Sequence, residues 1–212
     1  MKKELICRIF SRMPQLETER LILRRMRVGD EQDMYEYARR SEVTRYLLWS
    51  PHPDLFYTRD YLRYLATRYA TGSFYDWAVV LRSNNRMIGT CGFTSFDCAH
   101  DAAEIGYVLN PDYRGQGIAP EAVRAVLAFG FERLALHRIE ARFIEGNAAS
   151  LRVMEKVGMC FEGYRREAML VKGAYRTIGY CSILASDYEA QKNAMLDTDV
   201  DEIPRKSAFS GG

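Results

Sequence analysis

The chain has 212 residues, of which 48% are hydrophobic and 27% charged, and its formal net charge is +2. This length suits one domain with a full hydrophobic core, and the composition is that of a globular protein. The small net charge gives no reason to expect a nucleic-acid partner. The sequence has neither an apolar run of membrane-spanning length nor a convincing signal peptide, so we expect a cytoplasmic protein without a membrane partner.

Five cysteines, an odd number without any CxxC pair, favour reduced thiols in the core over disulfides. They are Cys7, Cys91, Cys98, Cys160 and Cys181. No histidine stands at a ligand spacing from them, so we expect no metal.

The first half of the chain predicts four strands and two helices. Alternating leucines predict a strand over 20–26, and helical spacing of apolar residues predicts helices over 29–42 and 58–71. Strands over 74–83 and 86–96 bracket Ser83-Asn84-Asn85, a typical hairpin turn, and a further strand covers 102–110.

The second half begins with a strong amphipathic helix from about 119 to 134. A strand over 138–145 follows, and then a short helix over 147–159 with Asn147 suited to the N-cap and Gly158 to a left-handed C-cap. Strands over 162–171 and 174–184 surround Lys172-Gly173, which predicts a second hairpin.

This order of elements predicts the α/β class. We expect a mixed, mostly antiparallel central sheet of about seven strands, with one strand–helix–strand crossover and about four helices on its faces. The domain is predicted to cover 16–188, between an N-terminal extension over 1–15 and a polar C-terminal tail over 189–212.

The crossover contains the stretch YRGQGIAP, residues 113–120, between a strand and a helix. Unpaired N–H groups and the dipole make a helix N-terminus a suitable site for an anion, and glycine lets an anion approach the backbone. An ordinary loop would also explain these glycines. No nucleotide P-loop string is present, and Pro120 stands where the dinucleotide pattern GxGxxG needs a small residue. The pattern [QR]xxGx[GA] is matched by Arg114, Gly117 and Ala119.

With this third pattern, the chain resembles the GNAT superfamily of acyl-CoA N-acyltransferases over residues 16–188. LETERLILRRM, AEIGYVLNPDYRGQGIAPEA and NAASLRVMEKVGM occur in the order typical of that superfamily. Within it, the chain is similar to the Rim-type (RimJ/RimL-like) enzymes that acetylate N-terminal amines of ribosomal proteins.

The resemblance implies acetyl-CoA as the acyl donor and a sheet that splays between its fourth and fifth strands. The pantetheine arm would lie in that gap against the backbone of Tyr107, Val108 and Leu109, and we expect the side chains of Tyr107 and Val108 in the core. The pyrophosphate would be wrapped by Arg114, Gly115, Gln116, Gly117, Ile118 and Ala119.

An amine must lose a proton before it attacks a thioester, and a carboxylate is a natural acceptor for that proton. Glu104 stands in an otherwise apolar strand beside the expected gap, where burial would raise its pKa. We therefore predict Glu104 as the catalytic base, with an ordinary surface glutamate as the alternative.

The leaving thiolate needs a hydrogen-bond donor. Many members of the superfamily use a tyrosine seven residues after the asparagine of the short helix, but Met154 stands at that position here. The Rim-type resemblance instead implies that Ser150 serves the sulfur and Asn147 contacts the coenzyme. Both residues are equally suited to the first turn of an ordinary helix.

The resulting prediction is an acetyl-CoA-dependent N-acetyltransferase acting on a primary amine in a ternary complex. A protein N-terminus, as in a ribosomal protein, is the first candidate for the acceptor, and polyamines or aminoglycosides are alternatives. A non-catalytic acyl-CoA-binding or sensing module stays open, whereas Pro120 and the strand order argue against a nucleotide-dependent oxidoreductase. The sequence does not distinguish a monomer from a homodimer.

Overall fold

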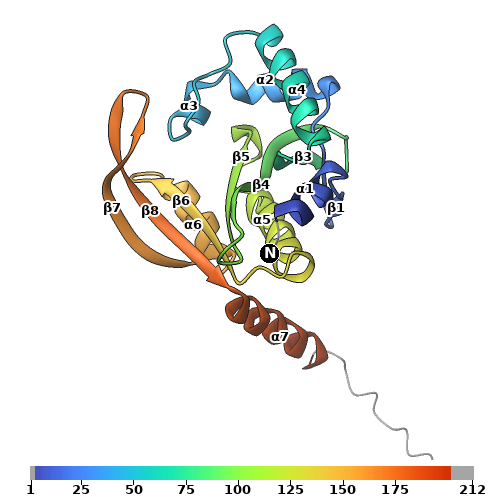
Figure 1. Cartoon of the computed structure of the whole chain (residues 1–212), viewed down its shortest axis with the longest axis vertical. Helices are drawn as coiled ribbons and strands as arrows, with labels where there is room; N and C mark the ends of the chain where they lie inside the picture. Colours follow the sequence, from blue (N-terminus) through green and yellow to red (C-terminus); the bar gives the residue numbers. More distant parts are fainter. Residues whose placement is uncertain (1–2, 202–212) are drawn as a thin grey trace, which may run out of the picture.

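The computed structural model describes residues 3–201 and contains one eight-stranded sheet in the order β1-β2-β3-β4-β5-β6-β8-β7 (Figure 1). Only the pair β5–β6 is parallel. The predicted mixed, mostly antiparallel sheet is confirmed, and β1 adds a short strand that the sequence analysis did not anticipate. The strands are β1 Leu16–Glu17, β2 Leu21–Arg24, β3 Tyr75–Leu81, β4 Met87–Asp97, β5 Ala102–Leu109, β6 Arg138–Ile144, β7 Cys160–Val171 and β8 Ala174–Leu184.

The described residues also form seven α-helices, more than the four expected. They are α1 Lys3–Ser11, α2 Glu31–Ala38, α3 Ser41–Thr44, α4 Leu55–Ala70, α5 Ile118–Ala128, α6 Ala148–Lys156 and α7 Ala185–Asp201. The helix predicted over 29–42 is divided into α2 and α3 because Arg40 adopts an extended backbone conformation. The helix predicted to reach 134 ends in a π-helical turn over Phe129–Arg133.

The predicted turns and caps are confirmed. Asn85 in the first hairpin and Lys172 in the second both have a positive φ, as tight hairpin turns require. The side chain of Asn147 accepts a hydrogen bond from the Ser150 N–H at the start of α6, and Gly158 has a φ of +82° just past its end.

Both ends of the chain contain helices that the sequence did not predict. Residues 3–11, expected as an extension, form α1, whose Phe10 is fully buried and packs edge-on against Trp77. Part of the expected polar tail forms α7, where Tyr188 and Lys192 bind Glu132. Residues 202–212 lie outside the described residues.

None of the five cysteines, which all lie in the described residues, forms a disulfide, as predicted, but they are not all in the core. Cys91 and Cys181 are buried, whereas Cys160 is exposed.

Each face of the sheet has its own helices. Trp77 points to the face covered by α1 and α5, where its ring contacts Phe10 and Phe129. Side chains alternate along a strand, so Asp76 points to the opposite face. That face is covered by α2 and α4, and Tyr69 of α4 donates its hydroxyl hydrogen bond to the Asp76 carbonyl. We call these the α5 face and the α2 face.

Candidate active site

The strands β5 and β6 separate part-way along their length. They pair from Ala102 with Arg138 to Ile105 with Ala141, and β5 then continues to Leu109 while paired with β4 only. In Figure 1, β6, β8 and β7 diverge from β3, β4 and β5 at this point. The predicted splay between the fourth and fifth predicted strands is thereby confirmed. Backbone groups of Tyr107, Val108 and Leu109 border the gap.

The turn before α5 is open and shaped by two glycines. Gly115 and Gly117 have φ values of +79° and +74°, and a Cβ added at Gly115 would meet no atom within 4 Å. Gly117 is the N-cap of α5, with no side-chain cap on the helix N–H groups. Residues 114–117 are exposed, whereas Ile118 is buried and can offer only its backbone. An anion can therefore approach the uncapped end of α5.

Arg20, which directly precedes β2, stabilises this turn by hydrogen bonds that the sequence did not predict. Its Nη1 donates to the Gln116 carbonyl at 2.9 Å, and its Nε donates to Glu121 at 2.6 Å. The Thr18 hydroxyl donates to the same carboxylate. These bonds neutralise the acidic side chain in the first turns of α5. They join segments about a hundred residues apart, which no local pattern reveals.

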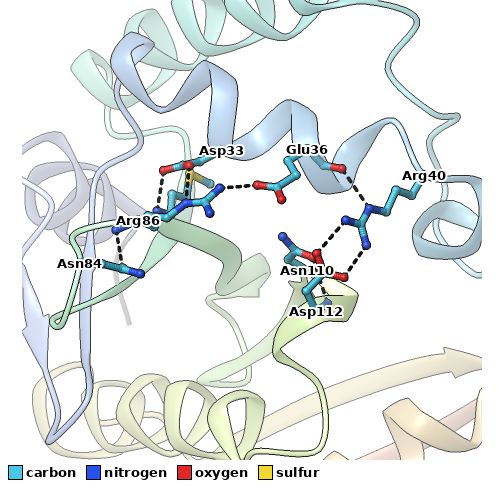
Figure 2. Close-up of polar contacts among 8 residues, drawn as sticks. Asp33, Glu36, Arg40, Asn84, Arg86, Asn110 and Asp112 are labelled. Atoms are coloured by element: carbon cyan, nitrogen blue, oxygen red, sulfur yellow. Dashed lines mark hydrogen bonds and ion pairs between the residues drawn. The ribbon is translucent and has the colours of Figure 1, made fainter.

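The loop between β5 and the glycine turn is tied to the segment between α2 and α3 (Figure 2). Arg40 donates two hydrogen bonds to the Asp112 carboxylate, at 2.8 and 2.7 Å. Asp112 in turn donates its backbone N–H to the side chain of buried Asn110. Arg86 at the start of β4 binds two carboxylates of α2, Asp33 and Glu36. The helix is thus fixed to both the β3–β4 hairpin and the turn that precedes α5.

Glu104 lies on the α2 face of β5, at the base of the gap. Its Oε1 accepts a hydrogen bond from Thr94 Oγ1 at 3.0 Å and lies 2.9 Å from Arg142 Nε. The side chain is only 17% exposed, unlike that of an ordinary surface glutamate. Burial raises the pKa of Glu104 above its ordinary value, although Arg142 and Thr94 act in the opposite direction.

Tyr107 and Ser150 meet on the α5 face. The Tyr107 hydroxyl lies 2.9 Å from the Ser150 carbonyl oxygen and 3.0 Å from Ser150 Oγ. Burial raises the pKa of Tyr107 well above its ordinary value, so the phenol stays neutral and can donate a hydrogen bond. The sequence analysis assigned Tyr107 only backbone contacts. Met154 is buried in the core and offers no hydrogen-bond donor.

The gap therefore has a carboxylate on one face and a hydroxyl pair on the other. Glu104 and Tyr107 are separated by an odd number of positions on one strand, which places them on opposite faces. Asn147 lies next to the Tyr107–Ser150 pair. Its side-chain oxygen accepts the hydrogen bond from the Ser150 N–H that caps α6. Such an arrangement can accept a proton on one side of the sheet and donate a hydrogen bond on the other.

A comparison with known protein families decides the membership of this chain. Residues 20–160 match the model described as an acetyltransferase (GNAT) domain. The chain belongs to the GNAT family of acetyltransferases. The predicted N-acetyltransferase is confirmed at this level, and the family takes its acetyl group from acetyl-CoA.

Similar proteins support the same family. An uncharacterized N-acetyltransferase p20 from Bacillus licheniformis is 32% identical over 83% of this chain and 99% of its own length. A GNAT acetyltransferase structure from Bacillus anthracis is 31% identical, with a TM-score of 0.73 over 82% of this chain and 99% of that one. A ribosomal-protein-S5-alanine acetyltransferase structure from Vibrio fischeri has a TM-score of 0.66 at 23% identity, over 82% and 98% of the two chains, and so shares the fold.

The residues of this chain fit acetyl-CoA. An uncapped helix N-terminus with open glycines suits a pyrophosphate, and the unpaired edge of β5 suits an amide-containing arm. In the described part of the chain, no group of three or more metal-ligating side chains is gathered. None of the helices described has the length and hydropathy to cross a bilayer.

Proposed function

We propose that this protein transfers an acetyl group from acetyl-CoA directly to a primary amine, with Glu104 as the proton acceptor and Ser150 as the hydrogen-bond donor to the leaving sulfur. The observation that carries the proposal is the position of these two groups on opposite faces of the same splayed gap. An amine can reach the gap from the α2 face while the coenzyme occupies the α5 face.

Glu104 would act on the incoming amine. An alkyl ammonium has a pKa of about 10 and an α-ammonium about 8, so a base must remove a proton before attack. Partial burial keeps Glu104 more basic than an exposed glutamate, and Arg142 keeps its ionised form available at neutral pH. The carboxylate takes the proton directly or through one water.

Ser150 and Tyr107 would act on the sulfur side. The Tyr107 phenol has one proton and two acceptors, the carbonyl and the hydroxyl oxygen of Ser150. When Tyr107 donates to the hydroxyl oxygen, the proton of Ser150 is free to point into the gap. Tyr107 would therefore orient Ser150 rather than touch the sulfur itself.

The donor would be held by backbone groups. Acetyl-CoA supplies an activated thioester to this site. Residues Tyr107, Val108 and Leu109 offer backbone hydrogen bonds to its arm, one of which can polarise the carbonyl oxygen. Arg114, Gly115, Gln116, Gly117, Ile118 and Ala119 wrap its pyrophosphate, and Asn147 contacts the arm through its amide.

For the acceptor we propose a protein N-terminal α-amine. The support is the resemblance to Rim-type enzymes and the fold shared with a ribosomal-protein-S5-alanine acetyltransferase from Vibrio fischeri. The test is release of coenzyme A from acetyl-CoA with Ala- and Ser-starting peptides, using wild type and Glu104→Gln. Peptide-dependent release that the variant loses supports the enzyme and its base. Acetyl-CoA binding without release with any amine would instead indicate a binding module.

A further inference from the structure

Four side chains form a continuous row across the α2 face, from the gap to the outermost strand of the sheet. Arg142 of β6 lies 2.9 Å from the Glu104 carboxylate through its Nε, and Tyr180 of β8 is directly opposite Arg142 in the sheet register. The guanidinium of Arg165 on β7 lies over the Tyr180 ring, 4.5 Å from its centroid. The row therefore connects the proposed proton acceptor with the edge of the sheet.

This row is accessible along its whole length. Arg142 and Arg165 are exposed, and Tyr180 is only partly buried. Alternate residues of a strand face opposite sides, so the buried neighbours Phe143 and Gly179 belong to the α5 face, where α6 packs against β6 and β7. An acceptor that enters the gap from the α2 face can therefore extend along the row without passing through the core.

The two arginines of the row differ in their partners. Arg142 is engaged with the proposed proton acceptor, whereas no carboxylate in the described part of the chain forms an ion pair with Arg165. Two further acidic side chains on this face, Glu140 and Glu162, both bind Arg138. Stacking on an aromatic ring holds a guanidinium in place and leaves the N–H groups at its edge able to bind a carboxylate. Arg165 is thus an oriented donor that lacks an anionic partner.

The surface around Arg165 is positively charged. Residues 163–178 of the β7–β8 hairpin contain four basic side chains and one acidic side chain: Arg165, Arg166, Lys172, Arg176 and Glu167. Lys172 donates to the Thr44 carbonyl at 2.6 Å, so the exposed Arg45 is next to the tip of this hairpin, as the position of α3 in Figure 1 shows. The formal net charge of the entire chain is only +2, so positive charge is concentrated here. Such a surface beside the reaction site attracts an acidic acceptor.

The length of the row fits a short stretch of peptide. Glu104 and Tyr180 are two strands and two residues apart, which places their Cα atoms about 12 Å from each other. An extended peptide rises about 3.3 Å per residue. A peptide whose terminal amine lies at Glu104 therefore reaches Arg165 with about its fourth residue.

We propose that Arg165, held over Tyr180, binds an acidic side chain about four residues into the acceptor. This inference rests on the proposed function and adds to it that the acceptor class is a peptide with an N-terminal amine and a carboxylate close behind it. Glu104 then serves the reacting amine at one end of the row, and Arg165 selects the acceptor at the other. The coenzyme is assigned to the α5 face, so its phosphates do not compete for Arg165.

The experiment uses C-terminally amidated octapeptides that start with Ala and carry either Asp or Asn as the fourth residue. For wild type we expect kcat/KM to favour the Asp peptide by about three- to tenfold, between the effects of an exposed ion pair and of a buried charged hydrogen bond. In Arg165→Gln the two peptides should be acetylated equally. Arg166→Gln removes the same charge from the adjacent exposed residue of β7 and should keep the preference.

A third peptide tests the position of the carboxylate. With Asp as the eighth residue and Asn as the fourth, the rate should equal that of the peptide without Asp, because the carboxylate lies beyond the row. An equal gain from Asp at either position would indicate diffuse attraction and overturn the assignment to Arg165. The melting temperature of Arg165→Gln should match that of wild type, because the side chain is exposed.

Calorimetry with coenzyme A in place of acetyl-CoA needs no turnover. The Asp peptide should bind the protein–coenzyme complex about three- to tenfold more tightly than the Asn peptide, and Arg165→Gln should remove the difference. If no peptide is acetylated, the proposed acceptor class is wrong, while this measurement still tests Arg165. Equal binding of the two peptides, or a difference that survives Arg165→Gln, would overturn the inference. Tighter, Arg165-dependent binding of an oligouridylate would overturn it as well, since the surface would then serve RNA.

Discussion

Replacing Tyr107 with Phe tests whether Tyr107 orients Ser150, which is proposed to donate the hydrogen bond to the leaving sulfur. The change keeps the buried ring and removes only the hydroxyl that lies 3.0 Å from Ser150 Oγ. A neutral hydrogen bond contributes about 0.5–1.5 kcal/mol, so loss of its orienting effect in the transition state should reduce kcat by about 3- to 10-fold. The assay is release of free thiol at saturating acetyl-CoA and amine.

The decisive comparison is made in a second background. Ser150→Ala alone should reduce kcat by about 10- to 100-fold if its hydroxyl serves the leaving sulfur. If Tyr107 acts through Ser150, then Tyr107→Phe should change kcat less than about twofold once Ser150 is alanine. A merely structural role for the tyrosine would lower activity equally in both backgrounds.

Controls separate orientation from packing. The Kd of acetyl-CoA and the melting temperature should be nearly the same for Tyr107→Phe and wild type, because the ring and its contacts remain. Additive losses in the double variant would refute the proposed coupling between Tyr107 and Ser150. A full loss of coenzyme binding in Tyr107→Phe would contradict it as well, since only backbone groups of this residue are assigned to the coenzyme.

Three further predictions concern other parts of the site. Arg142→Met should raise the pKa of Glu104 and move the acid limb of kcat/KM to higher pH, because the attraction that favours the ionised carboxylate is lost; Arg142→Lys should restore most of the original pH profile. Gly117→Ala should weaken acetyl-CoA binding in calorimetry and destabilise the protein by about 1 kcal/mol, since φ is +74° there; an unchanged melting temperature would contradict this. Asp76→Asn should stabilise the protein by on the order of 2 kcal/mol above pH 7, because a folded-state pKa raised from 3.8 means that stability falls as pH rises through that window; denaturant unfolding at pH 4 and pH 8 should show the gain only at the higher pH.

The parts of the structure that could be predicted from the sequence are those fixed by local chemistry. Lys172-Gly173 and the Asn147 cap depend on backbone preferences of a few residues, and each is found where it was expected. The turn at Gly115 and Gly117 could be predicted for the same reason. Two glycines directly before a helical pattern indicate a turn with positive φ at the start of a helix.

The parts that could not be predicted depend on distant partners. Tyr107 looks like a core residue until α6 brings Ser150 to its hydroxyl, 43 positions further along the chain. Asp76 looks like a surface residue until β4 places Gly92 opposite and α2 covers it. In α1, by contrast, a signal was present: Ile6 and Phe10 are four residues apart on one helical face, but the charged residues between and around them hid it.

The separation of the two faces explains why the gap must remain open. Had β5 and β6 paired along their full length, the backbone edge of Tyr107 to Leu109 would be satisfied by β6, and no path would join the two sides of the sheet. The pairing stops at Ile105, one residue after Glu104, so the carboxylate belongs to the last paired residue of β5 that faces the α2 side. A proton acceptor placed there reaches an amine entering from the α2 face, while the Tyr107–Ser150 pair remains on the side where a thiol leaves. Shifting Glu104 by one position along β5 would move it to the α5 face, so the strand register itself determines which partner of the reaction each group can serve.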